Sequence, residues 1–521
     1  MKTIINIATK LLSAVWIIAG LYSCSDEALN KVNESVDHPK SVQSKYIISE
    51  VITSTAVHNI GGDFNTYFSS YVEHEVGIDN QLWRAETRQG EPSSSSTFNN
   101  TWSSLYTALR DARIAIDQCS EGGRDAGNSV TRGIAEVLAA YNSALIADAF
   151  GDSPWSEAAV INPDGSPKSM TPKIDPQQDI YTGVMAYLDA AITDLQGTDK
   201  SAIGSFDFLF KGDKAKWLKL AYGLKARYTL HLLARSSNVS ADLNKILDYV
   251  SKSFATVNEQ AAFNVYNATN LNPLFDFQWS RDGLAASESM SEKLLERNDP
   301  RFRRVFVDAN WVQIDSQDGE NFFMAPNGTA EQLRYYYNTS VFVFSQTAST
   351  MFMSYHELLF IKAEALARKG DIATAKSVLK QAVVAAIANT ELSVQAAFNA
   401  PAVNVYGGLE ETTDAISPKE AADYFDTEVN PLFDENPLKE VMIQKYIAFF
   451  GASGESTEAY NDVRRLKALK ENFISLANPN KFPLRCGYGN SDTTTNPDVK
   501  NAFGDGQYVY TEPVWWAGGT R

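Results

Sequence analysis

Histidine and acidic side chains are the usual basis of metal binding and acid–base chemistry, and this chain places few of them at meaningful spacings. It has five histidines, and no two of them follow the HExxH or HxH spacing of a metal site. The triplet Glu73-His74-Glu75 combines suitable residue types, but adjacent side chains on a helix point in different directions. His231 and His356 fall within predicted helices, where packing is the commoner role. The sequence therefore predicts no metal site.

Motifs for catalysis are equally scarce. The sequence contains no GxSxG elbow, no GxGxxG fingerprint and no P-loop. A sugar hydrolase needs only two opposed carboxylates, and 63 acidic residues do not exclude such a pair. Asp148 with Asp152, and Asp276 with Asp282, lie near each other in sequence but have no recognisable catalytic context. We predict a protein that is not an enzyme and uses no cofactor, with a helical glycoside hydrolase at the cell surface as the alternative.

Aromatic and charged side chains in polar loops favour binding instead. Sugar rings stack on exposed aromatic faces, while arginine and carboxylate groups pair with hydroxyls. Loops 77–101 and 264–345 are too long to be simple connectors, and both carry such residues. The predicted ligand-binding residues are Trp83, Arg84, Trp279, Arg281, Asp282, Trp311, Tyr335 and Tyr336. Burial in the core is the competing interpretation for each aromatic, and a platform near Trp515 and Trp516 is the alternative location.

The elements that would position these loops are mostly helical by their apolar period. Helices are predicted over 101–119, 133–150, 177–195 and 213–234, with Asp213 as an N-cap for the last. Residues 354–388 read as two helices joined by a Gly370-Asp371 turn, which resembles a tetratricopeptide unit, although an ordinary helical hairpin would look the same. Irregular stretches are predicted at 77–101, 151–176, 264–345, 395–436 and 481–521. The expected fold is mainly α, a scaffold of tetratricopeptide-like hairpins with long irregular loops and little β structure.

The N-terminal residues have the features of a targeting segment. Lys2 and Lys10 precede an apolar run that is too short to span a bilayer, as in a signal peptide. A small residue, Ser23, then precedes Cys24, which resembles a bacterial lipobox, and acidic residues follow directly. We expect a signal peptide at 1–23, a flexible tether at 24–40 lipidated on Cys24, and one domain over 41–521. The predicted location is the outer membrane at the cell surface, with contact to lipid only through this anchor.

The net charge limits which partners are expected, and the two remaining cysteines raise the question of a disulfide. The formal net charge is −17, which repels phosphate backbones, so nucleic acid is not expected as a partner. Cys119 and Cys486 lie in polar loops, and the sequence leaves open whether they form a disulfide or stay free.

Several segments, taken in order, resemble the SusD/RagB family of nutrient-binding outer-membrane lipoproteins of Bacteroidetes. Residues 148–158 (DAFGDSPWSEA) are similar to the family's "tD.fGdvPysEA" stretch, and 212–227 to its "GD..kW.k.a.sLk.R" segment. Residues 353–358 (MSYHEL) with 363–365 (AEA) match its tetratricopeptide segment. Residues 443–446 (IQKY) and Arg464-Arg465 match its C-terminal third. Each motif alone is weak, whereas the ordered set is specific and covers most of 45–521.

The resemblance implies a tetratricopeptide-like framework that binds an oligosaccharide or peptide and delivers it to a SusC-like, TonB-dependent transporter in the outer membrane. The matched motifs themselves look structural, and Trp102 and Trp217 are expected in the core. By chain position, relatives bind their ligands with the loop after the first helix and the irregular mid-chain region, which here hold Trp83 and residues 264–345. Tryptophans in polar loops favour a glycan over a peptide.

Overall fold

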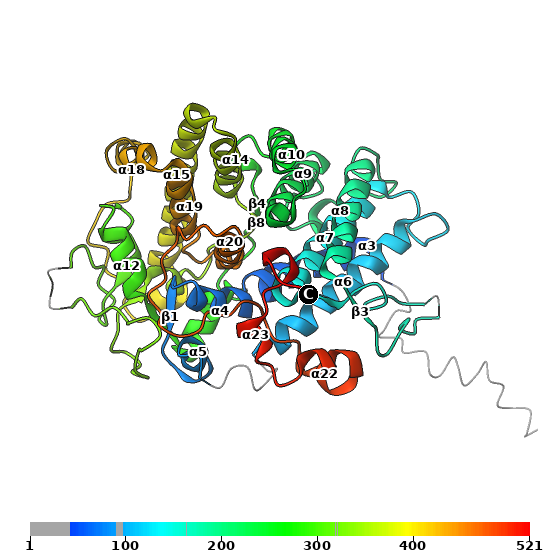
Figure 1. Cartoon of the computed structure of the whole chain (residues 1–521), viewed down its shortest axis with the longest axis horizontal. Helices are drawn as coiled ribbons and strands as arrows, with labels where there is room; N and C mark the ends of the chain where they lie inside the picture. Colours follow the sequence, from blue (N-terminus) through cyan, green and yellow to red (C-terminus); the bar gives the residue numbers. More distant parts are fainter. Residues whose placement is uncertain (1–41, 90–96, 163, 318, 320) are drawn as a thin grey trace, which may run out of the picture. The chain divides into compact units, whose positions relative to one another are not determined.

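The computed structural model describes residues 42–89, 97–162, 164–317, 319 and 321–521, and Ser44–Arg521 form one compact unit. The predicted signal peptide, the tether and Cys24 lie outside the described residues. Figure 1 shows a helical architecture. The α-helices are α3 (Ser44–Ser54), α4 (Asp63–Tyr71), α5 (Asn80–Glu86), α6 (Asn99–Cys119), α7 (Ser129–Phe150), α8 (Gln177–Asp194), α9 (Lys214–His231), α10 (Val239–Ser251), α11 (Pro273–Arg281), α12 (Glu288–Leu295), α13 (Phe302–Val305), α14 (Tyr355–Lys369), α15 (Ile372–Phe398), α16 (Pro401–Asn404), α17 (Pro418–Tyr424), α18 (Asn430–Glu435), α19 (Pro437–Ala448), α20 (Ser456–Ala468), α21 (Asn490–Thr495), α22 (Pro497–Phe503) and α23 (Tyr508–Thr511).

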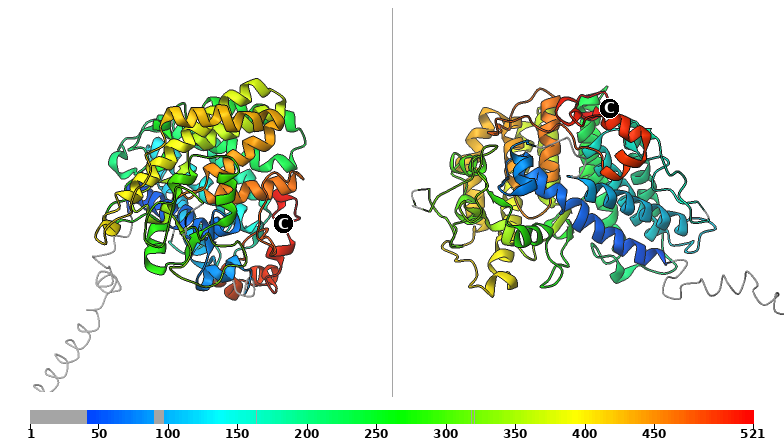
Figure 2. Two further views of the ribbon diagram at one scale, coloured as in Figure 1. Left: turned by 90° about the vertical axis from the view of Figure 1, so that its left-hand side faces the viewer. Right: turned by 90° about the horizontal axis from the view of Figure 1, so that it is seen from below.

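Shorter helical segments complete the list. Two π-helices, η1 (Thr55–Ile60) and η6 (Phe425–Val429), continue α3 and α17. The 3₁₀ turns are η2 (Gly204–Phe206), η3 (Leu232–Arg235), η4 (Val257–Glu259), η5 (Val341–Phe344) and η7 (Trp515–Ala517). Seen from below in Figure 2, α3 and η1 run diagonally across the front of the molecule in blue.

The long helices pack on one another in chain order. Helix α6 packs on α7, α7 on α8, α8 on α9, α9 on α10, and α10 on α14, which contacts both α15 and α19. Each helix therefore buries its apolar face against the next, which is how stacked helical repeats build a continuous core. The mainly α fold predicted from the sequence is confirmed.

Local sequence sets the ends of these helices. The Asp213 carboxylate accepts the N–H groups of Ala215 (3.0 Å) and Lys216 (3.3 Å), so the predicted N-cap is confirmed. The Ser354 hydroxyl caps α14 by accepting the N–H of Glu357 at 3.0 Å. Gly370 ends α14 in the left-handed region (φ 82°), where glycine has no Cβ to clash, and α15 begins two residues later. The hairpin is as predicted, but α15 runs past 388 to Phe398.

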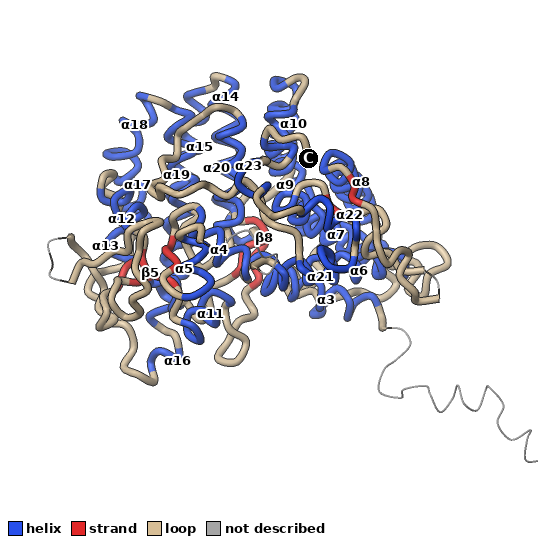
Figure 3. The backbone as a smooth tube through the Cα atoms, turned by 60° about the horizontal axis from the view of Figure 1, so that its bottom comes forward, coloured by secondary structure: helices blue, strands red, loops and turns tan. Residues whose placement is uncertain are grey.

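The four small sheets are two-stranded and antiparallel. They pair β1 (Glu75–Gly77) with β5 (Leu284–Ala286), β2 (Ser153–Pro154) with β3 (Ile174–Asp175), β4 (Ala261–Phe263) with β8 (Thr350–Met353), and β6 (Phe306–Val307) with β7 (Thr339–Ser340). Three of these pairs join segments far apart in the chain. The strands, red in Figure 3, therefore tie the mid-chain region to the N-terminal helices and to the approach to α14.

The predicted irregular stretches contain more regular structure than expected. Residues 264–345 include α11, α12 and α13, because local caps nucleate short helices there. The side chain of Asn272 accepts from Leu274 and Phe275 with Pro273 at the first helical position, and the Ser287 hydroxyl accepts from Met290. Such helices are too short for an apolar period to be visible in the sequence.

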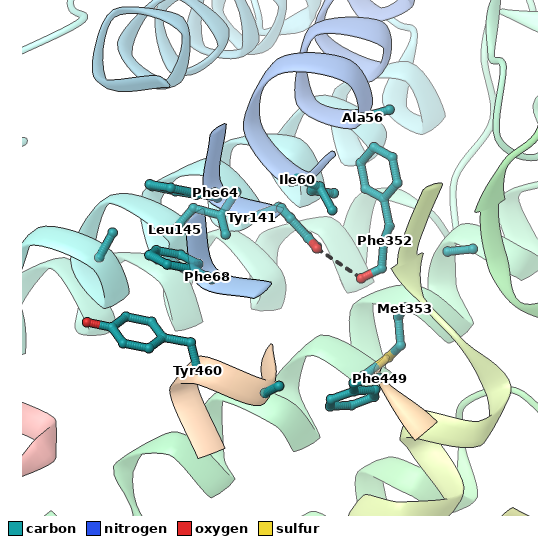
Figure 4. Close-up of a cluster of buried hydrophobic side chains, with 14 of the residues drawn as sticks. Ala56, Ile60, Phe64, Phe68, Tyr141, Leu145, Phe352, Met353, Phe449 and Tyr460 are labelled. Carbon is teal, nitrogen blue, oxygen red and sulfur yellow. Dashed lines mark hydrogen bonds between the residues drawn. The ribbon is translucent and has the colours of Figure 1, made fainter. Parts of the chain in front are cut away.

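Aromatic rings dominate the core where α4, α7 and α20 meet. Phe64 stacks on Phe68, and Phe68 stacks on Tyr460 with ring centroids 4.4 Å apart (Figure 4). Tyr141 is buried in the same cluster and donates its hydroxyl to the Phe352 carbonyl at 3.0 Å. The ring that α7 contributes is thus fixed to β8, because a buried hydroxyl requires a partner.

Several sequence questions are settled by burial. Trp102 and Trp217 are buried in the core, as predicted. Cys119 and Cys486 are two separate buried thiols, and burial raises the pKa of Cys119 to about 11, which disfavours its thiolate form. No helix in the described part of the chain is long and apolar enough to cross a membrane.

Candidate ligand-binding groove

An open groove of about 1150 Å³ lies between α4, α11 and the segment that precedes α11. Figure 3 shows α4, α5, α11 and α16 towards one end of the molecule, with α10, α14 and α15 towards the other. The groove is lined by His58, Asp63, Thr66, Tyr67, Asp79, Asn80, Phe208, Phe263, Tyr266, Asp276, Phe277, Ser280, Arg281 and Arg334, among others. Its size and its mix of rings and charged groups suit a polar ligand with an apolar face.

Glycines position Asp63 at one wall of the groove. A Cβ on Gly62 would lie 2.5 Å from the His58 carbonyl oxygen, so only glycine fits between η1 and α4 without a shift. Asp63 follows in the first turn of α4. Burial raises the pKa of the Asp63 carboxyl to about 6, although nearby Arg281 opposes the rise. Asp63 thus changes charge close to neutral pH.

The opposite wall is one face of α11. Leu274, Phe275 and Gln278 are buried beneath the helix, while Asp276 and Arg281 point to the other side and line the groove. The side chains of Asp63, Asp276 and Arg281 make no hydrogen bond or ion pair with any described residue. Asp276 and Arg281 are exposed and Asp63 is half-buried, so all three side chains can form hydrogen bonds with a ligand in the groove.

A cluster of aromatic residues lies beside α11. Trp279 stacks on Phe275 with centroids 5.4 Å apart, and its ring lies 6.4 Å from Trp311 and 5.9 Å from Tyr406. Trp279 is 40% exposed and Tyr406 is 71% exposed, whereas Trp311 is half-buried against Phe344. We call Trp279, Trp311 and Tyr406 the aromatic platform. It offers exposed ring faces next to the charged groove.

Other predicted ligand-binding residues lie elsewhere. Trp83 donates its indole N–H to the Ala330 carbonyl at 2.7 Å, and Arg84 donates to Asn80 at 3.1 Å. Asp282 ends α11 in a left-handed conformation and accepts from Gln278 at 3.0 Å. None of these three lines the groove.

Tyr335 and Tyr336 lie in a loop and are 79% and 51% exposed, and Tyr336 packs near Phe323. The alternative platform is only partly available, because Trp516 is buried and donates to Asp148. Of the predicted ligand-binding residues, the structure thus places Arg281 at the groove and Trp279 and Trp311 in the platform.

Sequence reasoning missed Asp63 and Tyr406. Asp63 shows no signal except the preceding Gly61-Gly62 pair, and Tyr406 follows a helix of four residues. Asp63 and Tyr406 belong to the candidate site only because the fold brings segments together that are far apart in the chain.

One cluster resembles a metal centre. The ligand atoms of Asp148, His231 and Glu458 lie within 4.8 Å of one another, and all three residues are buried. His231 instead makes contacts with both carboxylates, 2.9 Å from Nε2 to Glu458 and 3.3 Å from Nδ1 to Asp148. Burial alone would lower the pKa of His231, but these carboxylates raise it to about 9. In the described structure the imidazole thus bridges the two carboxylates, and we call this cluster the ion-pair centre.

The Glu73-His74-Glu75 triplet does not converge on a common point. Glu73 accepts the backbone N–H groups of Ala477 and Asn478, and Glu75 accepts from the Ser340 hydroxyl. His74 lies within hydrogen-bonding distance of Ser456 and the Tyr446 carbonyl, and burial lowers its pKa to about 3. Through these contacts the triplet connects to four other segments of the chain, which contain Ser340, Tyr446, Ser456 and Ala477.

The motif residues form a buried charged seam between helices. Arg227 of α9 binds Glu357 of α14, with Nε 2.6 Å from Oε1. Arg465 of α20 binds Glu364 of α14 at 2.6 and 2.8 Å and Asp462 at 2.7 Å. These residues are at most 4% exposed. The motifs therefore hold the scaffold together and do not form the ligand site.

Stacked helices that carry an open groove and exposed rings define a binding protein built on a helical-repeat scaffold. The chain matches the family model SusD-like, described as starch-binding and associating with the outer membrane, over residues 37–489. This protein belongs to the SusD-like family, and the resemblance found in the sequence is confirmed.

Solved structures give the same result. A SusD/RagB family protein from Bacteroides thetaiotaomicron VPI-5482 is 54% identical, over 92% of this chain and 100% of that one, with a TM-score of 0.87. A chitin-binding protein (19% identity, 91% and 100% covered, TM-score 0.66) and a SusD homolog from Bacteroides fragilis NCTC 9343 (18%, 92% and 100%, 0.67) share the fold. Comparison with curated protein sequences gave no match.

Proposed function

We propose that the protein is a cell-surface lipoprotein that binds an oligosaccharide in the groove and on the aromatic platform, and delivers it to a SusC-like, TonB-dependent transporter. The observation that carries the proposal is a set of three charged side chains in the groove, Asp63, Asp276 and Arg281, that make no hydrogen bond or ion pair with the described residues. The family's description as starch-binding supports a glycan, and one relative with this fold is named as chitin-binding.

The groove matches the chemistry of a sugar. A pyranose ring has apolar faces, formed by C–H groups, and hydroxyls around its edge. Phe277 on α11 offers a half-buried ring to such a face, while Asp63 and Asp276 accept from hydroxyls and Arg281 donates to them. The platform lies on the neighbouring side of α11, so a chain of several sugars can contact both.

Other observations support the proposed membrane attachment and the proposed transporter partner. The lipobox ending at Cys24 supports a lipid anchor, and the family is described as associating with the outer membrane. A surface binder without a pore of its own requires a transporter to bring its ligand into the cell. Gentle detergent extraction and pull-down should recover a TonB-dependent barrel, and recovery of the lipoprotein alone at low and moderate salt would count against this partner.

The test of binding is a glycan array beside a peptide library, followed by calorimetry with the best ligand. Replacing Arg281 by Gln should weaken binding of that ligand, while Arg110→Gln, an exposed site outside the groove lining, should not. Peptide-only binding would overturn the glycan assignment. Cleavage of the bound glycan that is abolished by Asp63→Asn would favour the glycoside hydrolase alternative.

A further inference from the structure

A second, smaller pocket of about 330 Å³ lies between the end of α4, the residues after α5, and α20 with the segment that follows it. It shares no lining residue with the groove. Its lining consists of Tyr71, Arg88, Val463, Leu466, Lys467, Glu471, Asn472, Ile474, Leu476, Asn478, Asn480 and Phe482. Figure 1 shows α4, α5 and α20 close together.

Arg88 supplies one positive charge to this pocket. Its guanidinium lies 4.7 Å from the centre of the Tyr71 ring. Nε donates to the Lys481 carbonyl at 3.2 Å, and Nη1 donates to the Ala85 carbonyl. These contacts hold the guanidinium in place. Burial raises the pKa of the Glu86 carboxyl, and the charge of Arg88 opposes this rise. No described carboxylate accepts a hydrogen bond from Arg88, however, and Nη2 makes no hydrogen bond among the described residues.

Lys467 supplies a second positive charge. Its Nζ lies 4.4 Å from the centre of the Phe482 ring and makes no hydrogen bond or ion pair within the described ranges. Partial burial lowers the pKa of Lys467, and no carboxylate offsets this effect. An anion bound beside Nζ would remove the penalty of burying this charge.

The only carboxylate in the lining is already neutralised. Glu471 accepts two hydrogen bonds from Arg368, at 2.8 and 2.7 Å. In a chain of net charge −17, this pocket therefore presents two cations, Arg88 and Lys467, that form no ion pair with a carboxylate of the lining.

Side-chain amides complete the pocket on a fixed loop. Glu73 holds the loop by accepting the N–H groups of Ala477 and Asn478 at 2.8 and 2.6 Å. Asn480 donates its amide to the Gly328 carbonyl at 2.9 Å, which leaves its Oδ1 without a hydrogen bond among the described residues. Asn472 makes no side-chain hydrogen bond in the same part of the structure. Amides in this position suit hydroxyl groups, which both donate and accept.

We propose that this pocket binds a monosaccharide that carries a carboxylate, a sugar acid, with the carboxylate between Arg88 and Lys467 and the hydroxyls at Asn472 and Asn480. The two cations of the lining, neither of which is hydrogen-bonded to a carboxylate, favour an anion. The pocket is too large for a simple anion alone, and its amides match the remaining hydroxyls. This site is independent of the ligand in the groove.

The test is calorimetric titration of the purified protein with D-glucuronate, D-glucose and acetate at constant ionic strength. Glucuronate should bind with a Kd of about 1 mM, as expected for so small a ligand, and glucose and acetate about tenfold more weakly. Equal binding of glucose would show that the cations are unused, and equal binding of acetate would show a simple anion site; either result overturns the proposal.

Variants locate the site. Lys467→Gln should weaken glucuronate binding about three- to fivefold, a modest loss because the partly desolvated side chain of Lys467 stays open to solvent on one side. Lys481→Gln, which removes a positive charge just outside the lining, should bind as the wild type does, and so should the groove variant Asp63→Asn. Arg88→Gln should weaken binding if it folds. Unchanged affinity in Lys467→Gln overturns the proposal, whatever Arg88→Gln does.

Discussion

At the residue scale, Trp279 and Trp83 have the same side chain in different surroundings. Trp279 exposes part of its ring on the platform, whereas Trp83 uses its indole N–H to bind Ala330. Trp279→Ala should weaken glycan binding about five- to thirtyfold with little change in Tm, because a stacked ring is lost. Trp83→Ala should lower the Tm and leave the affinity of the folded protein unchanged. Calorimetry of binding and of unfolding separates the two; the reverse result would move the site to α5.

Asp63 should make ligand binding depend on pH. The pKa of its carboxyl is about 6 in the free protein, so Asp63 is charged at pH 7.5 and largely protonated at pH 5. A carboxylate accepts hydroxyl hydrogen bonds more strongly than a carboxylic acid does. Affinity should therefore fall about three- to tenfold from pH 7.5 to pH 5. Asp63→Asn should bind weakly and with a flat profile over this range, and a wild-type profile without a step near pH 6 would contradict the role of Asp63.

At the element scale, the long helices could be predicted from the sequence and the site could not. The helices beginning near Asp213 and Ser354 follow an apolar period and have local caps. A short stretch of sequence is therefore sufficient to predict them. The groove depends on α4 meeting α11, and the platform depends on Trp279 meeting Tyr406. No local rule brings such distant segments together. Arg281 and Trp279 could be named as candidates because residue type alone marks them, whereas Asp63 resembles any other aspartate at the start of a helix.

The buried seam between α14 and α20 should be sensitive to the loss of one partner. Arg465→Met leaves Glu364 and Asp462 buried with fewer cations, since Arg465 binds both. We expect a loss of about 3 kcal/mol in the free energy of unfolding, measured by urea denaturation. Lys419→Met, which breaks the exposed pair with Asp423, is the matched control and should unfold as the wild type does. Equal stability of both variants would show that the seam contributes nothing.

The His231 centre between α7, α9 and α20 should make stability depend on pH. Asp148, Glu458 and the Tyr181 hydroxyl face this imidazole, and its folded pKa of about 9 lies above the value of 6.5 expected when unfolded. Protonation therefore stabilises the folded state fully below pH 6.5, and this contribution is lost as the pH rises to about 9. The loss should reach about 3 kcal/mol across that window. Urea denaturation at several pH values gives the free energy of unfolding as a function of pH. Between pH 6.5 and 9 this free energy should fall less steeply in His231→Gln than in the wild type. An equally steep fall in both proteins would show that the ion-pair centre does not cause it.

At the scale of the whole molecule, the scaffold and the surface that binds are separate. The buried seam and the stacked helices make one compact unit from Ser44 to Arg521, while the groove and the platform lie on short elements. In the groove lining, Arg334 pairs with Asp79, whereas Asp63, Asp276 and Arg281 make no hydrogen bond or ion pair with the described residues. A change at the groove should then alter affinity without unfolding the scaffold.

The anchor can therefore be removed without loss of binding. Cys24→Ala should release the protein from the membrane fraction, because a lipid attached to this residue is the expected attachment. Palmitate-analogue labelling should disappear in the variant, while its affinity for the glycan and its Tm should equal those of the wild type, since the described groove and core are formed by residues after Gln43. Labelling that persists in Cys24→Ala would show that the lipobox is misassigned. Lost glycan affinity at an unchanged Tm would instead show that the N-terminal residues take part in binding.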